Sequence, residues 1–345
     1  MENYTPIFSI TPEILSSAYE IAADLERIDR IREKALTPQL RKENRIKTIH
    51  SSLWIEANSL TLEQVTDIVD GKKVLGPPKD ILEVKNAIIA YDELLECNPY
   101  KEKDLLNQHR LLMDGLITDA GKYRNAGVGV FDGEVPIHIA PPQQRVPLLM
   151  SQLLDWVRTA KLPQVVKSCI FHYEFEFIHP FSDGNGRMGR MWQTLLLYQE
   201  NSLFAWLPIE SIIAHHQQEY YRALRRSTHN NDSGIFAQFM LSVIKEATAG
   251  FKEKYSKGEL KDVTSNAGVS AGVNAGVKLS KVQEKIVAII AKDSSISQSE
   301  IAKKMKINES TVYRNIEKLK QLGVLERKGA DKTGRWIIKR AVKND

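Results

Sequence analysis

One stretch of twelve residues, 179–190, constrains this chain more than any other. It reads His-Pro-Phe-Ser-Asp-Gly-Asn-Gly-Arg-Met-Gly-Arg, and a helical pattern continues from it to Tyr198. Gly184 and Gly186 let the backbone bend and turn N–H groups toward an anion. An anion held there would lie at a helix N-terminus, where the helix dipole favours negative charge. The stretch therefore predicts a phosphate site at the start of a helix.

The polar side chains of this stretch suit phosphate chemistry. Arg187 and Arg190 are three residues apart, so they are neighbours on one helical face and can both bind phosphate oxygens. Asp183 can bind a divalent metal through oxygen. His179 stands just before the loop, where it can take a proton from an attacking hydroxyl. A glycine-rich loop with a buried histidine is the alternative, but no packing requirement explains all these polar residues together.

The stretch resembles the signature of the Fic family, His-Pro-Phe-x-(Asp/Glu)-Gly-Asn-Gly-Arg-x-x-Arg, at every fixed position. The resemblance extends over roughly residues 40–240. It implies a helical bundle with a β-hairpin flap, and the transfer of a nucleoside monophosphate, usually AMP from ATP, to a protein hydroxyl.

Roles for single residues follow from this resemblance by position. His179 would deprotonate a target Ser, Thr or Tyr, and Asp183 would bind Mg²⁺ that bridges the phosphates. Gly184, Asn185 and Gly186 would hold the phosphates through backbone and amide contacts. Arg187 and Arg190 would neutralise the leaving pyrophosphate, since metal and arginine stabilise negative charge where it develops.

A hairpin next to the site is a weaker match to the family. Residues 121–124, Gly-Lys-Tyr-Arg, followed by residues 128–131 resemble the family's flap hairpin, with Val130 and Phe131 as the flap residues. Alternation of apolar residues around Asp132-Gly133 independently predicts a β-hairpin. The edge of such a flap can dock an extended target segment by strand addition.

Three further residues, two tyrosines and a histidine, have competing interpretations. Tyr220 and Tyr221 resemble the segment that places aromatic rings near the adenine, and helix packing is the alternative. His172 lies seven residues before His179, on roughly the same helical face, and is interpreted as a packed histidine rather than a ligand.

Residues 51–58 resemble the family's inhibitory motif, (Ser/Thr)-x-x-x-Glu-(Gly/Asn), with Ser52 and Glu56 in the matching positions. In the family this glutamate pairs with the second signature arginine, here Arg190, and so occupies the guanidinium that the γ-phosphate needs. A motif placed before the signature implies a class II Fic protein. The alternative is that Glu56 is a surface glutamate on an amphipathic helix. A second hypothesis is that Glu56 also positions water for the removal of AMP.

The residue after Glu56 departs from the motif. Ala57 stands where the family usually has Gly or Asn. Asn58 is therefore predicted to supply the left-handed helix stop one residue later.

The chain is predicted to be mainly α, with a small C-terminal winged-helix domain. Apolar residues recur at helical spacing over nearly the whole chain. The expected divisions are residues 1–100 as a helical region with the inhibitory helix, 101–255 as the Fic catalytic core, 256–277 as a linker and 278–345 as a winged helix-turn-helix. Three (Asn/Ser)-Ala-Gly-Val repeats in 264–277 indicate the linker, and a strand that pairs with another chain is the alternative there.

The C-terminal region combines helices, a hairpin and positive charge. Ser297-Gln-Ser-Glu300 has the pattern of a capping box, and residues 278–345 hold 17 Lys and Arg against 8 Asp and Glu, a net charge of +9. The remaining residues have a net charge of −4, so a polyanion partner such as DNA is expected for the tail. The candidate phosphate contacts are Arg314, Lys318, Lys320, Arg327, Lys328, Lys332 and Arg335. A protein-binding winged helix is the alternative.

Composition narrows the cellular setting. The 345 residues are 42% hydrophobic and 26% charged, as in a soluble globular protein of two or three domains. No apolar run approaches a membrane span and no secretion signal opens the chain. Cys97 and Cys169 have no metal-ligand spacing and are too few for a disulfide framework. A cytoplasmic location without membrane contact is expected.

The sequence as a whole predicts a protein adenylyltransferase whose activity is kept low by its own inhibitory helix. ATP is the expected co-substrate, Mg²⁺ the cofactor and a protein hydroxyl the acceptor, with self-modification and a homodimer left open. The rival class is a DNA-binding regulator that senses nucleotide without catalysis, although a sensor needs no base such as His179. Removal of AMP, and transfer from another nucleotide donor, are further alternatives.

Overall fold

The computed structural model describes residues 4–29, 38–132, 135–256, 281–294, 296–305, 309–321, 324–328 and 335–338. Two compact units, Met1–Val263 and Thr264–Asp345, divide the chain. Residues 1–100 and 101–255 lie in the same unit, which we call the helical body. Apart from Ser256, the predicted linker and its repeats lie outside the described residues.

The mainly α fold is confirmed. The helical body contains α1 (Pro12–Asp29), α3 (Pro38–Ile55), α4 (Leu62–Val69), α5 (Pro78–Glu93), α6 (Glu102–Met113), α7 (Val146–Thr159), α8 (Gln164–Ile178), α9 (Asn185–Glu200), α10 (Ile209–His215), α11 (Gln217–Asn230) and α12 (Ser233–Ser256). Three 3-10 helices, η1 (Leu94–Glu96), η2 (Gln143–Arg145) and η3 (Ser202–Trp206), connect some of them.

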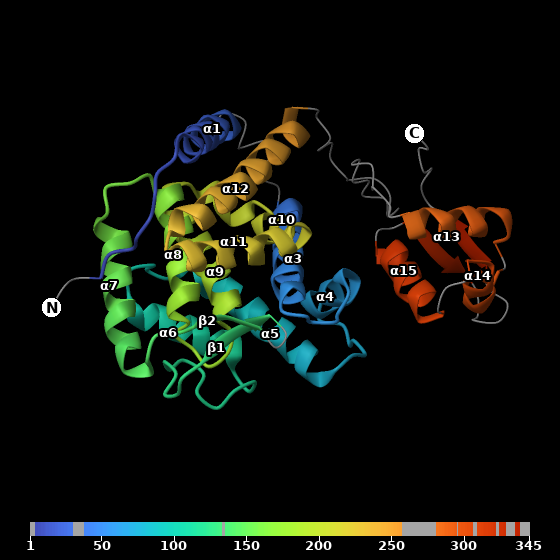
Figure 1. Ribbon diagram of the computed structural model, residues 1–345, viewed down its shortest axis with the longest axis horizontal. Helices are drawn as coiled ribbons and strands as arrows, with labels where there is room; N and C mark the ends of the chain where they lie inside the picture. Colours follow the sequence, from blue (N-terminus) through green and yellow to red (C-terminus); the bar gives the residue numbers. More distant parts are fainter. Residues whose placement is uncertain are drawn as a thin grey trace. The chain divides into compact units, whose positions relative to one another are not determined.

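The helices α8 and α9 lie side by side at the centre of the body (Figure 1). In α8, 13 of 15 residues are buried, and in α9, 12 of 16 are buried. Such helices are covered by other elements on every side. One apolar cluster joins α8 to α1, α11 and α12 around Phe236 and Tyr220. The other joins α8 and α9 to α3, α5, α6 and α7 around Trp192 and Phe181, so the loop from α8 to α9 is fixed from two sides.

The predicted hairpin is confirmed as β1 (Gly129–Asp132) paired antiparallel with β2 (Val135–Ile139). Val130 lies opposite His138 and Phe131 lies opposite Pro136, so the register shifts between them as in a β-bulge. Proline fits such a place because it has no N–H to donate to the ladder. The side chains of Val130 and Phe131 lie outside the described residues.

The C-terminal unit has the predicted order of elements. It contains α13 (Lys281–Lys292), α14 (Gln298–Met305), α15 (Glu309–Gln321), β3 (Leu325–Lys328) and β4 (Arg335–Ile338), with the two strands antiparallel. Its own apolar core gathers around Trp336, Ile301 and Ile316. The capping box is formed, because Glu300 N donates to Ser297 Oγ at 3.3 Å and Ser297 N donates to Glu300 Oε2 at 2.9 Å.

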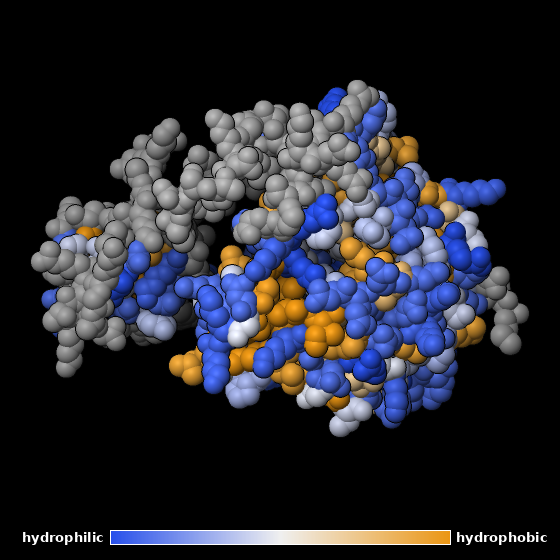
Figure 2. Space-filling model, turned by 180° about the vertical axis from the view of Figure 1, so that it is seen from behind, coloured by the Kyte–Doolittle hydropathy of each residue, from blue (hydrophilic) through white to orange (hydrophobic). Residues whose placement is uncertain are grey.

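On the face of the body shown in Figure 2, polar residues cover much of the surface and apolar residues gather in one area. Large apolar side chains with high exposure include Leu75 at 93%, Ile139 at 80% and Tyr19 at 76%. In the part of the chain that is described, no helix combines the length and the apolar character needed to cross a membrane.

The end of α3 differs from the prediction. Ala57, not Asn58, takes the left-handed conformation, with φ 66°. The amide of Asn58 donates to Leu53 O at 3.1 Å and that of Ala57 donates to Trp54 O at 3.0 Å, which is the Schellman pattern. The side chain of Asn58 is engaged instead with the start of α5, where Nδ2 donates to Asp80 O and to Glu83 Oε2. The helix stop therefore falls at Ala57, directly after Glu56.

Ala57→Gly should stabilise the protein, because glycine adopts a positive φ without the steric cost of a Cβ. The gain should be about 1 kcal/mol or less after the larger chain entropy of glycine is subtracted. Thermal unfolding should show a melting temperature raised by about 1–4 °C. Ala22→Gly on the exposed face of α1 is the matched control and should lower it. A melting temperature that falls in both variants would contradict the strain at Ala57.

Candidate active site

His179 occupies the residue directly after α8 and has a left-handed backbone, with φ 50° and ψ 63°. Glycine is the usual residue at such a helix end, so histidine there costs on the order of 1–2 kcal/mol. Its Nδ1 lies 3.3 Å from Glu176 O, the carbonyl one turn earlier. An N–H at Nδ1 can donate to that carbonyl, which leaves Nε2 with its lone pair. The side chain is 20% exposed, so Nε2 can act as a proton acceptor.

The loop after His179 is held by its own polar groups. Asn185 Oδ1 accepts from Phe181 N and Asn185 Nδ2 donates to Phe181 O, both at 2.9 Å. The amide of Asn185, expected to contact phosphate, therefore closes the loop here. Gly184 precedes α9 with φ 83°. The N–H groups of the first turn of α9 have no partner within the helix, so they can bind an anion.

The two signature arginines meet different partners. Arg187 Nη1 lies 3.4 Å from Glu83 Oε1, and its Nη2 lies 3.3 Å from Asp183 Oδ1. Arg190 belongs to the next turn of α9 and contacts the end of α3. Both side chains are nearly buried, at 4% and 1% exposure.

Ser52, Glu56 and Arg190 come together as the sequence predicts. Arg190 Nη2 lies 2.9 Å from Glu56 Oε1 and donates to Ser52 O at 3.0 Å, while Nε donates to Ser52 Oγ at 3.3 Å. A Cβ at Gly186 would collide with Glu56 Oε1. The carboxylate of Glu56 therefore lies against the first turn of α9, where an anion is favoured.

Two further buried glutamates surround Arg190, and sequence reasoning missed both. Burial raises the pKa of Glu176 to about 8. The charge of Glu56 adds to this increase in the pKa, and the charge of Arg190 opposes it. Burial likewise raises the pKa of Glu210 to about 7. Glu176 Oε2 also lies 3.9 Å from His179 Nδ1. At neutral pH Glu176 is largely protonated and Glu210 is about half protonated, so Glu56 supplies the larger share of the negative charge next to Arg190.

His109 is a positioning residue that the sequence did not reveal. Its Nδ1 accepts from Gly121 N at 2.9 Å, so Nε2 carries the hydrogen and donates to Asp183 O at 3.0 Å. The ring stacks on Phe181 with centroids 3.6 Å apart. Burial lowers the pKa of His109 to about 4, which keeps the ring neutral. The available signal was a lone histidine on the apolar face of a helix, which is ambiguous without tertiary contacts.

Tyr220 and His172 pack against each other in the interior. The hydroxyl of Tyr220 lies 3.0 Å from His172 Nε2, and His172 Nδ1 lies 2.6 Å from Gln193 Oε1. Both residues are buried, and burial lowers the pKa of His172 to about 3. The contacts of Tyr220 are thus those of helix packing. Tyr221 is half-buried beside it, with ring centroids 5.3 Å apart.

Asp183 is the residue here that suits a divalent cation. Its side chain is half-exposed, so its carboxylate can reach a ligand in solvent. Mg²⁺ is commonly bound by one or two carboxylates together with substrate phosphates and water. Within the described part of the chain, no group of three or more His, Cys, Asp or Glu residues could hold a metal without such help. The donor set fits a cation that arrives with a nucleotide.

In the C-terminal unit, several predicted phosphate contacts are engaged internally. The guanidinium of Arg327 lies 4.6 Å from the centroid of the Trp336 ring, and Lys320 Nζ lies 5.6 Å from it. Lys320 also pairs with Glu317 at 2.7 Å. Lys318 on α15 is exposed. The side chains of Arg314, Lys328, Lys332 and Arg335 lie outside the described residues.

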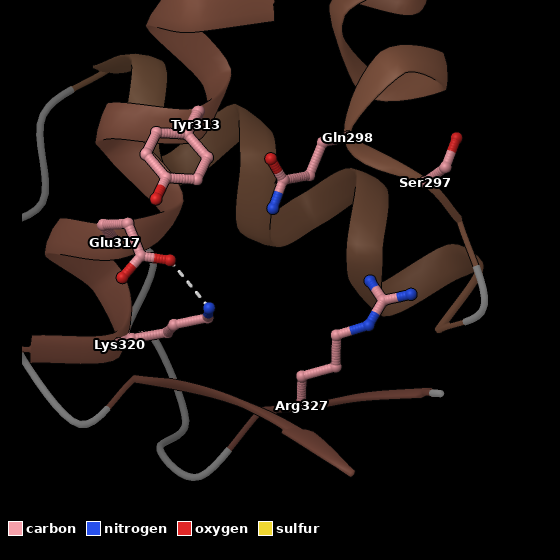
Figure 3. A pocket seen from close by; sticks show the side chains of 6 residues that line it. All are labelled: Ser297, Gln298, Tyr313, Glu317, Lys320 and Arg327. Carbon is pink, nitrogen blue, oxygen red and sulfur yellow. Dashed lines mark hydrogen bonds and ion pairs between the residues drawn. The ribbon is translucent and has the colours of Figure 1, made fainter. Parts of the chain in front are cut away.

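A pocket of about 410 Å³ lies between α15, the start of α14 and β3. Figure 3 shows Tyr313, Glu317 and Lys320 from α15 on one side, Gln298 from α14 on another and Arg327 from β3. The Glu317–Lys320 ion pair lies within it. Of the two α15 lysines, Lys320 lines this pocket and is half-buried, whereas Lys318 is exposed.

Comparison with known proteins identifies the relatives of both units. Residues 99–197 match the model of the Fic/DOC family, and residues 279–326 match that of the winged helix-turn-helix DNA-binding family. The solved structure of a Fic family protein from Desulfovibrio desulfuricans G20 is 38% identical, with a TM-score of 0.71, and the alignment covers 99% of this chain and 100% of that one.

Curated relatives with a named activity are more distant. Protein adenylyltransferase Fic of Nematostella vectensis is 29% identical over 229 residues, which cover 60% of this chain and 51% of the relative. Protein adenylyltransferase fic-1 of Caenorhabditis elegans is 25% identical over 301 residues, which cover 82% and 55%. The chain thus spans about half the length of these curated relatives. Given the similarity to the Desulfovibrio protein along its whole length, the chain belongs to the Fic family.

Proposed function

We propose that the chain is a protein adenylyltransferase that moves AMP from ATP to a Ser, Thr or Tyr hydroxyl, and that Glu56 inhibits it. One observation carries this proposal. His179 begins the loop that leads to the N-terminus of α9, its Nδ1 lies 3.3 Å from Glu176 O, and the guanidinium of Arg190, which is expected to bind phosphate, lies 2.9 Å from Glu56 Oε1. The names of the curated relatives support the same activity.

The proposed reaction is a displacement at the α-phosphorus of ATP. The target hydroxyl oxygen forms a bond to that phosphorus while the bond to the oxygen shared with the β-phosphate breaks, and pyrophosphate leaves. The hydroxyl proton goes to Nε2 of His179. Backbone N–H groups of the first turn of α9, with Arg187 and Arg190, balance the phosphate charge. When bound, Mg²⁺ held by Asp183 and phosphate oxygens would neutralise further charge.

Inhibition follows from competition for one guanidinium. The γ-phosphate of ATP and the carboxylate of Glu56 would both use Arg190 at the start of α9. While Glu56 occupies it, ATP would bind with its phosphates displaced from the line of attack on the α-phosphorus. Loss of the Glu56 carboxylate should release this restraint without removing any group that performs the reaction.

Replacement of His179 by Ala should abolish most of the transfer, because a hydroxyl is a weak nucleophile without a base. The expected loss in the rate of AMP incorporation from labelled ATP is on the order of 10²- to 10⁴-fold. His215→Ala, which removes an exposed histidine at the end of α10, should leave the rate unchanged. Equal incorporation by His179→Ala and the wild type would exclude His179 as the base.

Glu56→Gly should raise both self-modification and target modification well above the wild-type level, because it frees Arg190 for phosphate. Labelled ATP incorporation, alone and with lysate proteins, measures this directly. Glu96→Gly, at an exposed glutamate at the end of η1, is the matched control and should have no effect. A second assay starts from a target that already carries AMP. If the wild type with Mg²⁺ removes this AMP and Glu56→Gly does not, Glu56 also has the second, hydrolytic role.

We further propose that the C-terminal unit binds duplex DNA, on the ground that it matches a DNA-binding winged-helix family and has a net charge of +9. In this arrangement α15 would lie in the major groove. A winged helix that binds protein instead is the competing function.

Lys318→Ala in the full chain should weaken binding to duplex DNA and reduce the slope of log affinity against log salt concentration by about 1, since one phosphate contact is lost. Lys285→Ala, which removes an exposed lysine from α13, is the matched control and should change neither. No binding by the wild-type chain at low salt would rule out the DNA function.

A further inference from the structure

Arg124 connects segments on both sides of the candidate site through one guanidinium. The side chain is buried, at 3% exposure. Four of its five N–H groups donate to backbone carbonyl oxygens: Nε to His179 O at 2.7 Å, Nη1 to Ala126 O at 2.9 Å, and Nη2 to Pro141 O at 2.5 Å and Ile178 O at 3.3 Å. Its backbone N also donates to Pro180 O at 2.9 Å.

Two of these carbonyls lie at the C-terminal end of α8. The last carbonyls of a helix have no partner within it, and a positive charge there is favoured by the helix dipole. Arg124 supplies both the donors and the charge to Ile178 and His179. The left-handed backbone of His179 costs free energy. The hydrogen bonds from Arg124 hold the His179 carbonyl in place and therefore also fix the Cα that bears the imidazole side chain.

The other two carbonyls belong to the segments that enter and leave the hairpin. Ala126 precedes β1 and Pro141 follows β2. Between them, Ala140 N donates to Val128 O at 3.2 Å and closes the base of the hairpin. The same guanidinium thus fixes both ends of the hairpin to the end of α8.

Only arginine has the geometry for this set of contacts. Its planar group presents five donors in fixed directions, whereas lysine presents three from a single atom. Within the described ranges, no carboxylate forms an ion pair with Arg124, so backbone carbonyls balance its charge. Burial lowers the pKa of Arg124. A buried cation held by neutral acceptors alone depends on every one of those bonds.

We infer that Arg124 is a positioning residue that sets His179 and the hairpin edge relative to each other. A target segment docked on the hairpin would then present its hydroxyl at the distance that Nε2 of His179 requires. This inference rests on the proposed transfer of AMP to a docked protein segment. None of the four carbonyls belongs to Asp183, Gly184 or α9, so these hydrogen bonds do not involve the groups expected to bind ATP.

Arg124→Lys in the activated Glu56→Gly protein tests this inference. Lysine keeps the positive charge but cannot donate hydrogen bonds to all four carbonyls in their different directions. Transfer to a protein target should lose on the order of 10- to 100-fold in kcat through misalignment. The Kd for ATP, measured by calorimetry, should stay within about twofold, which is below 0.5 kcal/mol. Hydrogen exchange should be faster at the amide of Ala140 and unchanged at Leu195 in α9. The matched control, Arg110→Lys on the exposed face of α6, should behave like the parent.

Each other outcome has a distinct meaning. An Arg124→Lys protein with the parent's kcat and the parent's exchange at Ala140 would overturn the positioning role. A loss of ATP affinity and melting temperature in parallel with kcat would overturn it too, because general destabilisation explains that pattern. If the Glu56→Gly parent itself transfers no AMP, the proposed function fails rather than the placement of Arg124, which the exchange measurement still tests.

Discussion

The geometry of the site depends on the left-handed turn at His179 between two buried helices. Because α8 and α9 are covered on nearly every side, the chain must pass from one to the other within the short segment 179–184. That segment has His179, the proposed base, at its start and the N-terminus of α9 at its end. His109 and Arg124 hold it from outside through backbone carbonyls. The geometry of the candidate site is thus a consequence of helix packing.

Contacts from the end of α3 stabilise the buried guanidinium of Arg190. Arg190 is almost fully buried, and a buried cation requires partners that replace its hydration. Glu56 and Ser52 provide them in this structure. In the proposed mechanism phosphate provides them when ATP is productively bound. Because loss of a charged partner from a buried ion is costly, exchange of the Glu56 carboxylate for a phosphate is easier than opening of the ion pair with no replacement.

The C-terminal unit illustrates how internal contacts reduce the number of charges available to a partner. Its net charge of +9 comes from the sequence. In the structure, Arg327 and Lys320 stack near Trp336, and Lys320 also pairs with Glu317. A count of basic residues therefore overestimates the cations that could reach DNA phosphates, and an exposed position such as Lys318 is more informative.

Local patterns in the sequence determined the helices, the hairpin, the winged-helix order and the signature loop, because periodicity and motif spacing report on neighbours along the chain. The contact between Glu56 and Arg190 was predicted from the resemblance to the Fic family. Tertiary structure alone decided that Ala57 rather than Asn58 ends α3, because Asn58 is bound by α5. It alone also revealed the contacts of His109 and Arg124, whose partners lie 74 and 55 residues away. Such contacts arise only once helices pack, because packing brings donors and acceptors from distant segments into one buried space where each must find a partner.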